Sequence, residues 1–209
     1  MKGSLIILSA PSGAGKTTIE RLLLKEIPNL VKIITCTTRK PRKDEKDGVD
    51  YIFLSNEEFE KRIKEGKFLE YALVHGRYYG TPKEEVIKEI DKGNDVILTI
   101  DVQGTLYIKD NFSKEFDITT IFILPPSIDE LIKRLKLRGE SEDEINRRLN
   151  SLKKEVPKWK YYDYLVINED LEVAKESIKK IILSQRFKTT RLDLKNIKDE
   201  KLKELMKLE

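Results

Sequence analysis

The stretch SAPSGAGKTT, residues 9–18, constrains the fold more than any other part of this sequence. It overlaps the end of an apolar run at 4–10 and leads into a helical pattern at 16–27. Small residues let the backbone of such a loop curl so that successive N–H groups point inward, and the following helix adds partial positive charge at its N-terminus. A strand, a loop of small residues and a helix in this order predict a phosphate-binding loop in an α/β fold.

The remaining chain alternates short apolar runs with helical patterns. Several runs are apolar on both faces, as strands of a parallel sheet covered by helices are. We therefore predict strands at 4–10, 30–36, 95–101, 118–124 and 163–168. Helices are predicted at 16–27, 82–92, 127–138, 142–156 and 171–186. The predicted fold is a three-layer α/β fold with a doubly wound parallel sheet of about five strands.

Helix starts are marked by a Ser or Thr three residues before a Glu, the capping-box pattern. The pattern occurs at 55–58, 81–84, 127–130 and 141–144. Pro82 is predicted at the first helical position. Proline has no N–H, and at this position the N–H would have no partner within the helix.

Three segments depart from this alternation. Residues 50–80 contain short β-like pieces, which indicate a small mixed α/β insert. Residues 138–157 form a charged helical segment with few apolar positions, and 187–209 read as a polar, helical tail. The sequence therefore predicts one α/β core with appendages.

Composition excludes several classes of protein. The 41 basic and 37 acidic residues leave a net charge of only +4, so we expect no bulk binding of nucleic acid. Cys36 is the single cysteine, which excludes an intrachain disulfide and suggests a reducing compartment. No run is long enough to span a membrane, and residues 1–10 lack the pattern of a signal peptide. We expect a cytoplasmic protein with no membrane partner.

The chemistry of the loop points to a nucleoside triphosphate. Lys16 can reach the β- and γ-phosphates, and the Thr17 hydroxyl can bind Mg²⁺. Ala10 stands where the strict pattern has glycine, a mild departure if its φ is negative. The predicted ATP-binding residues here are Ala10, Pro11, Ser12, Gly13, Ala14, Gly15, Lys16, Thr17 and Thr18.

A GTPase is one alternative for a loop of this kind. DVQG at 101–104 matches the D-x-x-G element of that class, but the sequence contains no N-K-x-D element to read guanine. A four-residue match with two free positions carries little information, so the GTPase interpretation is weak.

The stretch TTRKPR, residues 37–42, raises the possibility of a second phosphate site. Arg39 and Arg42 lie on either side of a proline, and guanidinium groups suit bidentate contact with phosphate oxygens. Taken alone, the stretch fits a solvated basic turn better. Nearby, Glu70 lies in an apolar strand pattern where a carboxylate needs a partner. The same insert also contains three side-chain hydroxyl groups that could donate hydrogen bonds, those of Tyr51, Tyr79 and Thr81.

The whole set of blocks resembles the guanylate kinase family. The matching blocks occur in the family's order over about the first 190 residues: SAPSGAGKTT, TTRKPR, GVDYIFL, FLEYA, YYGTP, IDVQG, IFILPP, RLKLRG, INRRL and YDYLVINED. The resemblance implies transfer of the γ-phosphoryl group of ATP to GMP, giving ADP and GDP. It divides the chain into a core (1–34, 93–137 and 158–209), a GMP-binding insert (35–92) and a lid (138–157).

The resemblance also implies roles for residues of the insert. Arg39, Arg42, Tyr51 and Tyr79 match the family's ligands of the GMP phosphate. The family's residues at the guanine base are matched by Thr35, Glu70 and Asp101. Thr81 is also counted among the GMP-binding residues. A carboxylate accepts hydrogen bonds only, so it suits the N1–H and N2 amino donors of guanine and not the N1 acceptor of adenine.

In the lid, Arg138 and Arg148 match arginines that close on the transferring phosphoryl group, with Arg134 nearby. The resemblance thus implies catalytic roles for Lys16, Arg39, Arg138 and Arg148. Asn168 matches a position near the donor adenine. Without the resemblance, the lid arginines would fit a solvated helix face.

One position departs from the family. Members commonly carry two acidic residues in the strand that ends IDVQG, and Thr99 replaces the first of them here. A neutral hydroxyl brings no charge to the surroundings of Mg²⁺, which leaves Thr17 and the ATP phosphates as the expected ligands.

Two alternatives stay open. The chain could be a P-loop kinase for another nucleoside monophosphate, or a guanylate-kinase-like module that binds protein partners without catalysis. Such modules tend to have damaged phosphate loops, whereas Gly15, Lys16 and Thr17 are intact. The sequence does not distinguish a monomer from a homo-oligomer.

Overall fold

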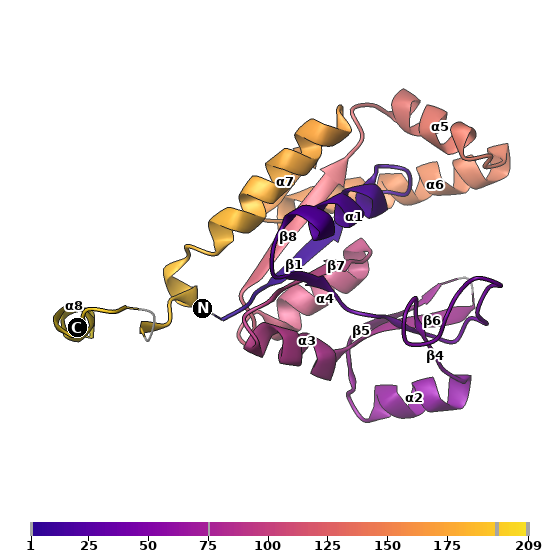
Figure 1. Ribbon diagram of the computed structural model, residues 1–209. Helices are drawn as coiled ribbons and strands as arrows, with labels where there is room; N and C mark the ends of the chain where they lie inside the picture. Colours follow the sequence, from indigo (N-terminus) through magenta and orange to yellow (C-terminus); the bar gives the residue numbers. More distant parts are fainter. Residues whose placement is uncertain (1, 75, 195–196, 208–209) are drawn as a thin grey trace.

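The computed structural model describes residues 2–74, 76–194 and 197–207 of the chain (Figure 1). Its core is a five-stranded sheet with the order β2-β7-β1-β8-β9, and every neighbouring pair is parallel. The strands are β1 (Leu5–Ser9), β2 (Leu30–Lys32), β7 (Asp95–Thr99), β8 (Ile118–Leu124) and β9 (Tyr164–Ile167). The predicted three-layer, doubly wound parallel sheet is confirmed.

Helices cover both faces of this sheet (Figure 1). Ile6 and Leu8 of β1 pack in one buried cluster with α1 (Lys16–Glu26) and α7 (Leu171–Gln185). The alternate β1 residues face the other way, into a cluster with α3 (Lys83–Asp91) and α4 (Val102–Phe112). Both faces of β1 are therefore buried. This explains why its sequence is almost entirely apolar and does not alternate between apolar and polar residues.

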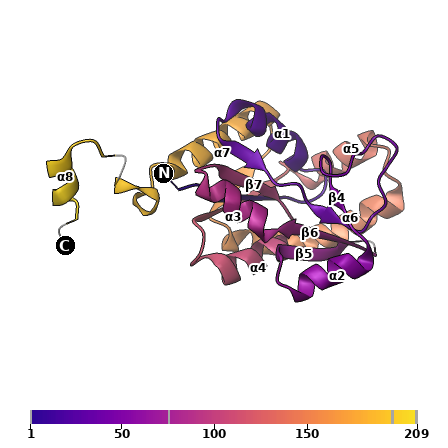
Figure 2. The ribbon, with the colours of Figure 1, turned by 60° about the horizontal axis from the view of Figure 1, so that its bottom comes forward.

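The insert forms a second sheet of four strands, in the order β4-β3-β6-β5 (Figure 2). These are β3 (Cys36–Thr37), β4 (Ile52–Phe53), β5 (Phe68–Val74) and β6 (Arg77–Pro82). Helix α2 (Asn56–Lys64) packs Phe59 against Phe68 and Cys36, with the two phenyl rings stacked at 4.3 Å between centroids. The sheet mixes parallel and antiparallel pairs. With α2 packed on it, the region contains both strands and a helix, as expected for a small mixed α/β insert.

The predicted single strand at 30–36 is wrong. Residues 30–32 pair with β7 in the core sheet, whereas 36–37 pair with β4 and β6 in the second sheet. Composition alone could not reveal the change of sheet, because Leu30 in the first sheet, Cys36 in the second and Ile33 between them are all buried.

Three of the four predicted capping residues are confirmed. Ser55, Ser127 and Ser141 each accept a hydrogen bond from the backbone N–H three residues later. The fourth prediction is wrong, because Thr81 and Pro82 belong to β6 and Pro82 is the N-cap of α3, not its first residue. The Thr81 hydroxyl instead donates to a carboxylate in the neighbouring strand.

Helix α4 was not predicted. Its N-cap is Asp101, whose Oδ1 accepts from the N–H of Gly104 at 2.8 Å. The sequence signal was present, since Asp is a preferred N-cap residue, but no Glu stands three positions later to complete a capping box.

Two helices form the segment that contains the predicted lid. Helix α5 (Ile128–Leu137) and helix α6 (Glu142–Glu155) pack together through Leu131, Leu135 and Ile145. A short 3₁₀ helix, η1 (Val156–Tyr161), returns the chain to β9. The boundaries proposed for the core, the insert and the lid stay predictions.

The predicted helical tail is confirmed only in part. It contains the 3₁₀ helix η2 (Thr189–Arg191) and helix α8 (Glu200–Leu205), which lies away from the rest of the molecule in both views (Figures 1 and 2). Within the described ranges, no helix is long and apolar enough to cross a membrane.

A buried carboxylate fixes the start of this tail to the core sheet. Asp95, at the start of β7, is 1% exposed and accepts hydrogen bonds from Ser4, from Arg186 at 2.9 Å and from Arg191 at 2.6 Å. Arg191 is itself 4% exposed, so this ion pair is shielded from water.

Removing this carboxylate should destabilise the fold. Asp95→Ala leaves the buried Arg191 without its counter-charge, which lowers the free energy of unfolding by about 3–5 kcal/mol in urea denaturation. Asp117→Ala is the matched control, because Asp117 pairs with the more exposed Lys188 of the same segment and should cost no more than about 1 kcal/mol. Equal losses of unfolding free energy in the two variants would show that Asp95 does not compensate a buried charge.

Candidate active site

The phosphate loop runs from the end of β1 to the first turn of α1. Gly13 and Gly15 have φ angles of +90° and +99°, which side-chain-bearing residues rarely adopt. A Cβ on Gly15 would lie 2.4 Å from Nδ2 of Asn168, and that amide donates to the Ala14 carbonyl at 2.7 Å. Asn168, predicted from the sequence as an ATP-binding residue, therefore lies against the loop.

The Lys16 side chain runs from the loop toward the end of β7. Its ammonium donates to the Ile100 carbonyl at 3.3 Å. Burial lowers the pKa of Lys16, while the carboxylates of Asp101, Glu155 and Glu20 act in the opposite direction. One ammonium thus lies among three acidic side chains that come from separate parts of the chain.

A cavity of about 380 Å³ opens beside the loop. It is lined by Gly13, Gly15, Thr18, Arg134, Arg138 and Asn168, with two leucines. The structure therefore brings four predicted ATP-binding residues together with the predicted lid arginine Arg138. Arg148, the second predicted lid arginine, donates to the Ser12 hydroxyl of the loop and to Glu140.

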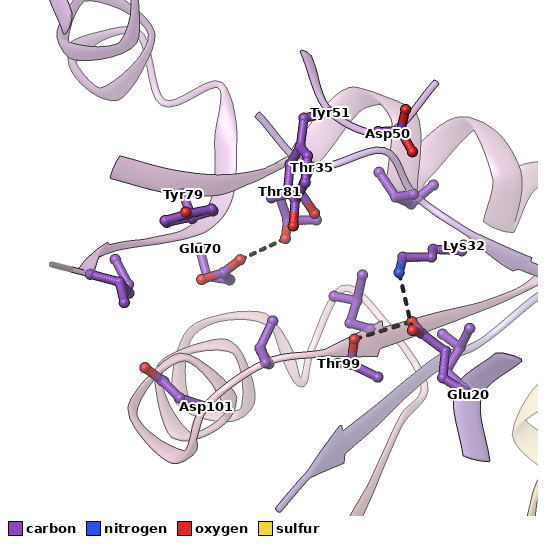
Figure 3. Close-up of a pocket in the computed structure, with 16 residues that line it drawn as sticks. Glu20, Lys32, Thr35, Asp50, Tyr51, Glu70, Tyr79, Thr81, Thr99 and Asp101 are labelled. Carbon is purple, nitrogen blue, oxygen red and sulfur yellow. Dashed lines mark hydrogen bonds and ion pairs between the residues drawn. The ribbon is translucent and has the colours of Figure 1, made fainter. Parts of the chain in front are cut away.

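A second cavity, of about 280 Å³, lies between the core sheet and the insert (Figure 3). Six of the eight residues predicted to bind GMP line it: Thr35, Tyr51, Glu70, Tyr79, Thr81 and Asp101. Thr81 and Tyr79 come from β6 and Glu70 from β5, whereas Asp101 follows β7 of the core. Both sheets are needed to enclose this space.

Glu70 is the buried carboxylate of this cavity. It is 7% exposed and accepts a hydrogen bond from the Thr81 hydroxyl at 2.6 Å. Burial raises the pKa of Glu70 to about 6, and the nearby charge of Asp101 acts in the same direction. A Cβ on Gly104 would approach Glu70 Oε2 to 3.2 Å, so the absence of a side chain there leaves room beside the carboxylate.

Arg39 and Arg42 do not line this cavity. The Arg39 guanidinium pairs with Glu45 at 2.8 Å, an interaction that raises its pKa, and it lies over the ring of Tyr51 at 5.3 Å. Arg42 is exposed, and its backbone N–H donates to the other oxygen of Glu45. The basic stretch therefore lies next to a wall of the cavity, since the Tyr51 ring both lines the cavity and lies under the Arg39 guanidinium.

Sequence reasoning missed four charged residues of the site. Glu20, Lys32 and Asp50 line the cavity between the sheets, and Glu155, at the end of α6, contributes to the charge around Lys16. Burial raises the pKa of Glu155, and Asp101 does so to a lesser extent. Only Glu20 carried a usable signal, as an acidic residue among the apolar positions of a helix that follows the phosphate loop.

The fold and the glycine-containing loop after β1 define a P-loop protein of the α/β class, with one cavity beside the loop and a second between the core sheet and the insert. The family model for guanylate kinase matches residues 2–185. The chain is 47% identical to a guanylate kinase of Caldanaerobacter subterraneus subsp. tengcongensis, over 91% of each sequence. It is 45% identical to that of Clostridioides difficile over 97% of each.

A solved structure agrees with these sequence matches. The crystal structure of guanylate kinase from Anaplasma phagocytophilum superposes with a TM-score of 0.73 at 35% identity, covering 91% of this chain and 89% of the other. The chain belongs to the guanylate kinase family.

The geometry of the phosphate loop predicts a sensitive position. Gly15→Ala adds backbone strain of about 1–3 kcal/mol and drives Cβ into Asn168, so ATP affinity measured by calorimetry should fall about 5- to 150-fold. Gly66→Ala is the control, because its φ is +65° but nothing lies within 4 Å of the added Cβ. ATP affinity unchanged in Gly15→Ala would show that the loop is not the donor site.

Proposed function

We propose that this protein transfers the γ-phosphoryl group of ATP to GMP, giving ADP and GDP. One observation carries the proposal: the Lys16 ammonium of the phosphate loop bonds to the carbonyl of Ile100, a residue that lines the cavity between the sheets. The donor loop and the acceptor cavity thus adjoin each other. Two phosphate-bearing ligands placed there would have their reacting groups close together, which is how such enzymes lower the barrier.

The acceptor cavity suits guanine. Glu70 is positioned by Thr81, and its carboxylate can accept from the N1–H and N2 amino groups of the base. Asp101 offers a second acceptor from the core side, and the Thr35 hydroxyl can donate to O6. Adenine would leave the buried carboxylate facing an acceptor, a loss of about 1–3 kcal/mol or more.

The basic stretch supplies the acceptor phosphate site in this proposal. Arg39 is held by Glu45 beside the ring of Tyr51, and Arg42 is exposed and able to reach a ligand. The phosphate would share Arg39 with Glu45 and accept further bonds from the hydroxyls of Tyr51 and Tyr79. Charge-assisted contacts of this kind are short and strong.

The donor side neutralises the charge that moves during transfer. Lys16 and the loop N–H groups would hold the ATP phosphates, while Arg138 and Arg148 close from the α5–α6 segment. The bond from the γ-phosphorus to the bridging oxygen of ADP breaks as a bond to a GMP phosphate oxygen forms, with no covalent enzyme intermediate.

A divalent cation fits the donor side, and we propose Mg²⁺. The Thr17 hydroxyl is exposed on the first turn of α1, and acidic side chains surround Lys16. Oxygen donors of this type suit Mg²⁺, which binds with few protein ligands and several waters. When bound, the ion would neutralise charge on the donor phosphates.

A panel of acceptors tests the proposal and its alternatives. Coupled ADP-release assays with ATP and each of GMP, dGMP, AMP, CMP and UMP should show turnover only with guanine nucleotides. Preferred turnover of another monophosphate would identify a different P-loop kinase, and no turnover with any acceptor would favour a non-catalytic binding module.

Arg42→Ala should raise the KM for GMP and leave that for ATP nearly unchanged. Loss of hydrogen bonds to a charged group costs about 1.5–3 kcal/mol, which corresponds to about a 10- to 150-fold increase. Lys43→Ala, one residue further and equally exposed, is the control and should change neither constant more than about twofold. A parallel rise in both KM values would contradict the assignment of Arg42.

GMP binding should weaken in acid. Because burial raises the pKa of Glu70 to about 6, the side chain gains a proton below that pH and no longer accepts from both guanine donors. Affinity should fall about tenfold per pH unit below 6, measured by calorimetry.

The phosphate of GMP also titrates near pH 6, so the two contributions must be separated. Glu70→Gln should retain only the phosphate contribution, whereas guanosine with the unaltered protein should retain only that of Glu70. The same pH dependence in Glu70→Gln and the unaltered protein would show that Glu70 does not read the base.

A further inference from the structure

Glu20 is a buried carboxylate for which the proposed reaction has so far no use. Its side chain is 3% exposed and leaves α1 on the side that faces the end of β7 (Figure 3). Oε1 accepts from the Thr99 hydroxyl at 3.1 Å, and Oε2 accepts from the Lys32 ammonium at 3.0 Å. All three residues line the cavity between the sheets.

Packing alone does not explain this residue. Its neighbours Ile19 and Leu23 on α1 join the apolar cluster under the sheet, and an apolar side chain at 20 would avoid the cost of burying a charge. The partner Lys32 is 50% exposed, so water weakens the attraction between the two. Each carboxylate oxygen can accept two hydrogen bonds and accepts one from Thr99 or Lys32, which leaves acceptor capacity on a side chain that lines the cavity.

The position of Glu20 on α1 relates it to the donor phosphates. It follows Thr17 by three residues and Lys16 by four, and residues at these spacings are neighbours on a helix surface. Its charge also acts on the Lys16 ammonium, together with the charges of Asp101 and Glu155. Three carboxylates would repel the phosphates of two nucleotides meeting there unless a cation lay between them.

We propose that Glu20 is a positioning residue for the hydrated divalent cation that accompanies the donor nucleotide. Its carboxylate accepts hydrogen bonds from water on the ion, and the Thr99 hydroxyl fixes the orientation of that carboxylate. The inference rests on the proposed function, since it concerns the ion bound with ATP. The inference also accounts for the neutral Thr99 in β7. The carboxylate near the ion would come from Glu20 of α1, and Thr99 would orient it.

A charge-relocation experiment tests this role. The dissociation constant of ADP is measured by calorimetry with Mg²⁺ and with EDTA, for the unaltered protein, Glu20→Gln and the double variant Glu20→Gln/Thr99→Asp. Removing a group that orients a metal's surroundings costs about 10- to 100-fold. Glu20→Gln should weaken ADP binding by about tenfold with Mg²⁺, whereas binding in EDTA should be unchanged or stronger because one repelling charge is gone.

The double variant restores a carboxylate within reach of the same place, because the Thr99 hydroxyl lies 3.1 Å from Glu20 Oε1. It should recover most of the Mg²⁺-dependent affinity. Lys32→Met is the control for the ion pair: it removes the partner of Glu20 but keeps the carboxylate, so the Mg²⁺-dependent affinity should persist.

Other results would overturn the inference. These are equal weakening of ADP binding with and without Mg²⁺, no weakening in Glu20→Gln, no recovery in the double variant, or the same loss in Lys32→Met. If Glu20→Gln does not fold, as judged by circular dichroism, Glu20→Asp serves instead, with its shorter carboxylate expected to weaken only Mg²⁺-bound ADP. Failure of the proposed function is a separate result, seen as absent GMP turnover in the unaltered protein.

Discussion

The parallel pairing of five strands is the constraint on which the rest of the structure depends. Because β1 lies between β7 and β8 with all strands in one direction, their carboxyl ends meet at one edge of the sheet. The phosphate loop follows β1, Asp101 follows β7 and Asn168 follows β9. Parallel α/β sheets place their ligands at this edge, and here it gathers residues more than 150 positions apart, as the Asn168–Ala14 hydrogen bond shows.

Charged side chains at this edge and in the insert are paired with one another. Lys16 lies among three carboxylates, Arg39 is held by Glu45, and Arg148 is held by Glu140. Partial burial of a cation costs less free energy when a carboxylate lies beside it than when the cation has no partner. In the proposed function, phosphate oxygens would replace or join the carboxylates, so the side chains would be oriented in advance and less entropy would be lost on binding.

The acceptor cavity depends on two sheets at once. Glu70 and Thr81 come from adjacent antiparallel strands of the insert, whereas Asp101 and Glu20 come from the core. A small shift of the insert relative to the core would therefore change the distance between the groups proposed to read the base and those proposed to serve the donor. In the proposed function, this arrangement would couple recognition of the acceptor to access to the donor phosphates.

Several local elements follow from the amino-acid sequence alone: the loop after β1, the serine caps of α2, α5 and α6, and an insert between the second and third strands of the core. These depend on contacts within a few residues, so their signals stand side by side in the chain. Three features could be seen only in the folded chain. Residues 30–36 divide between two sheets, the Thr81 hydroxyl donates to Glu70 and does not cap a helix, and the Thr99 hydroxyl donates to Glu20. Each of these contacts joins residues 11 to 79 positions apart or two separate sheets, and no local pattern records which distant strand or side chain a residue will meet.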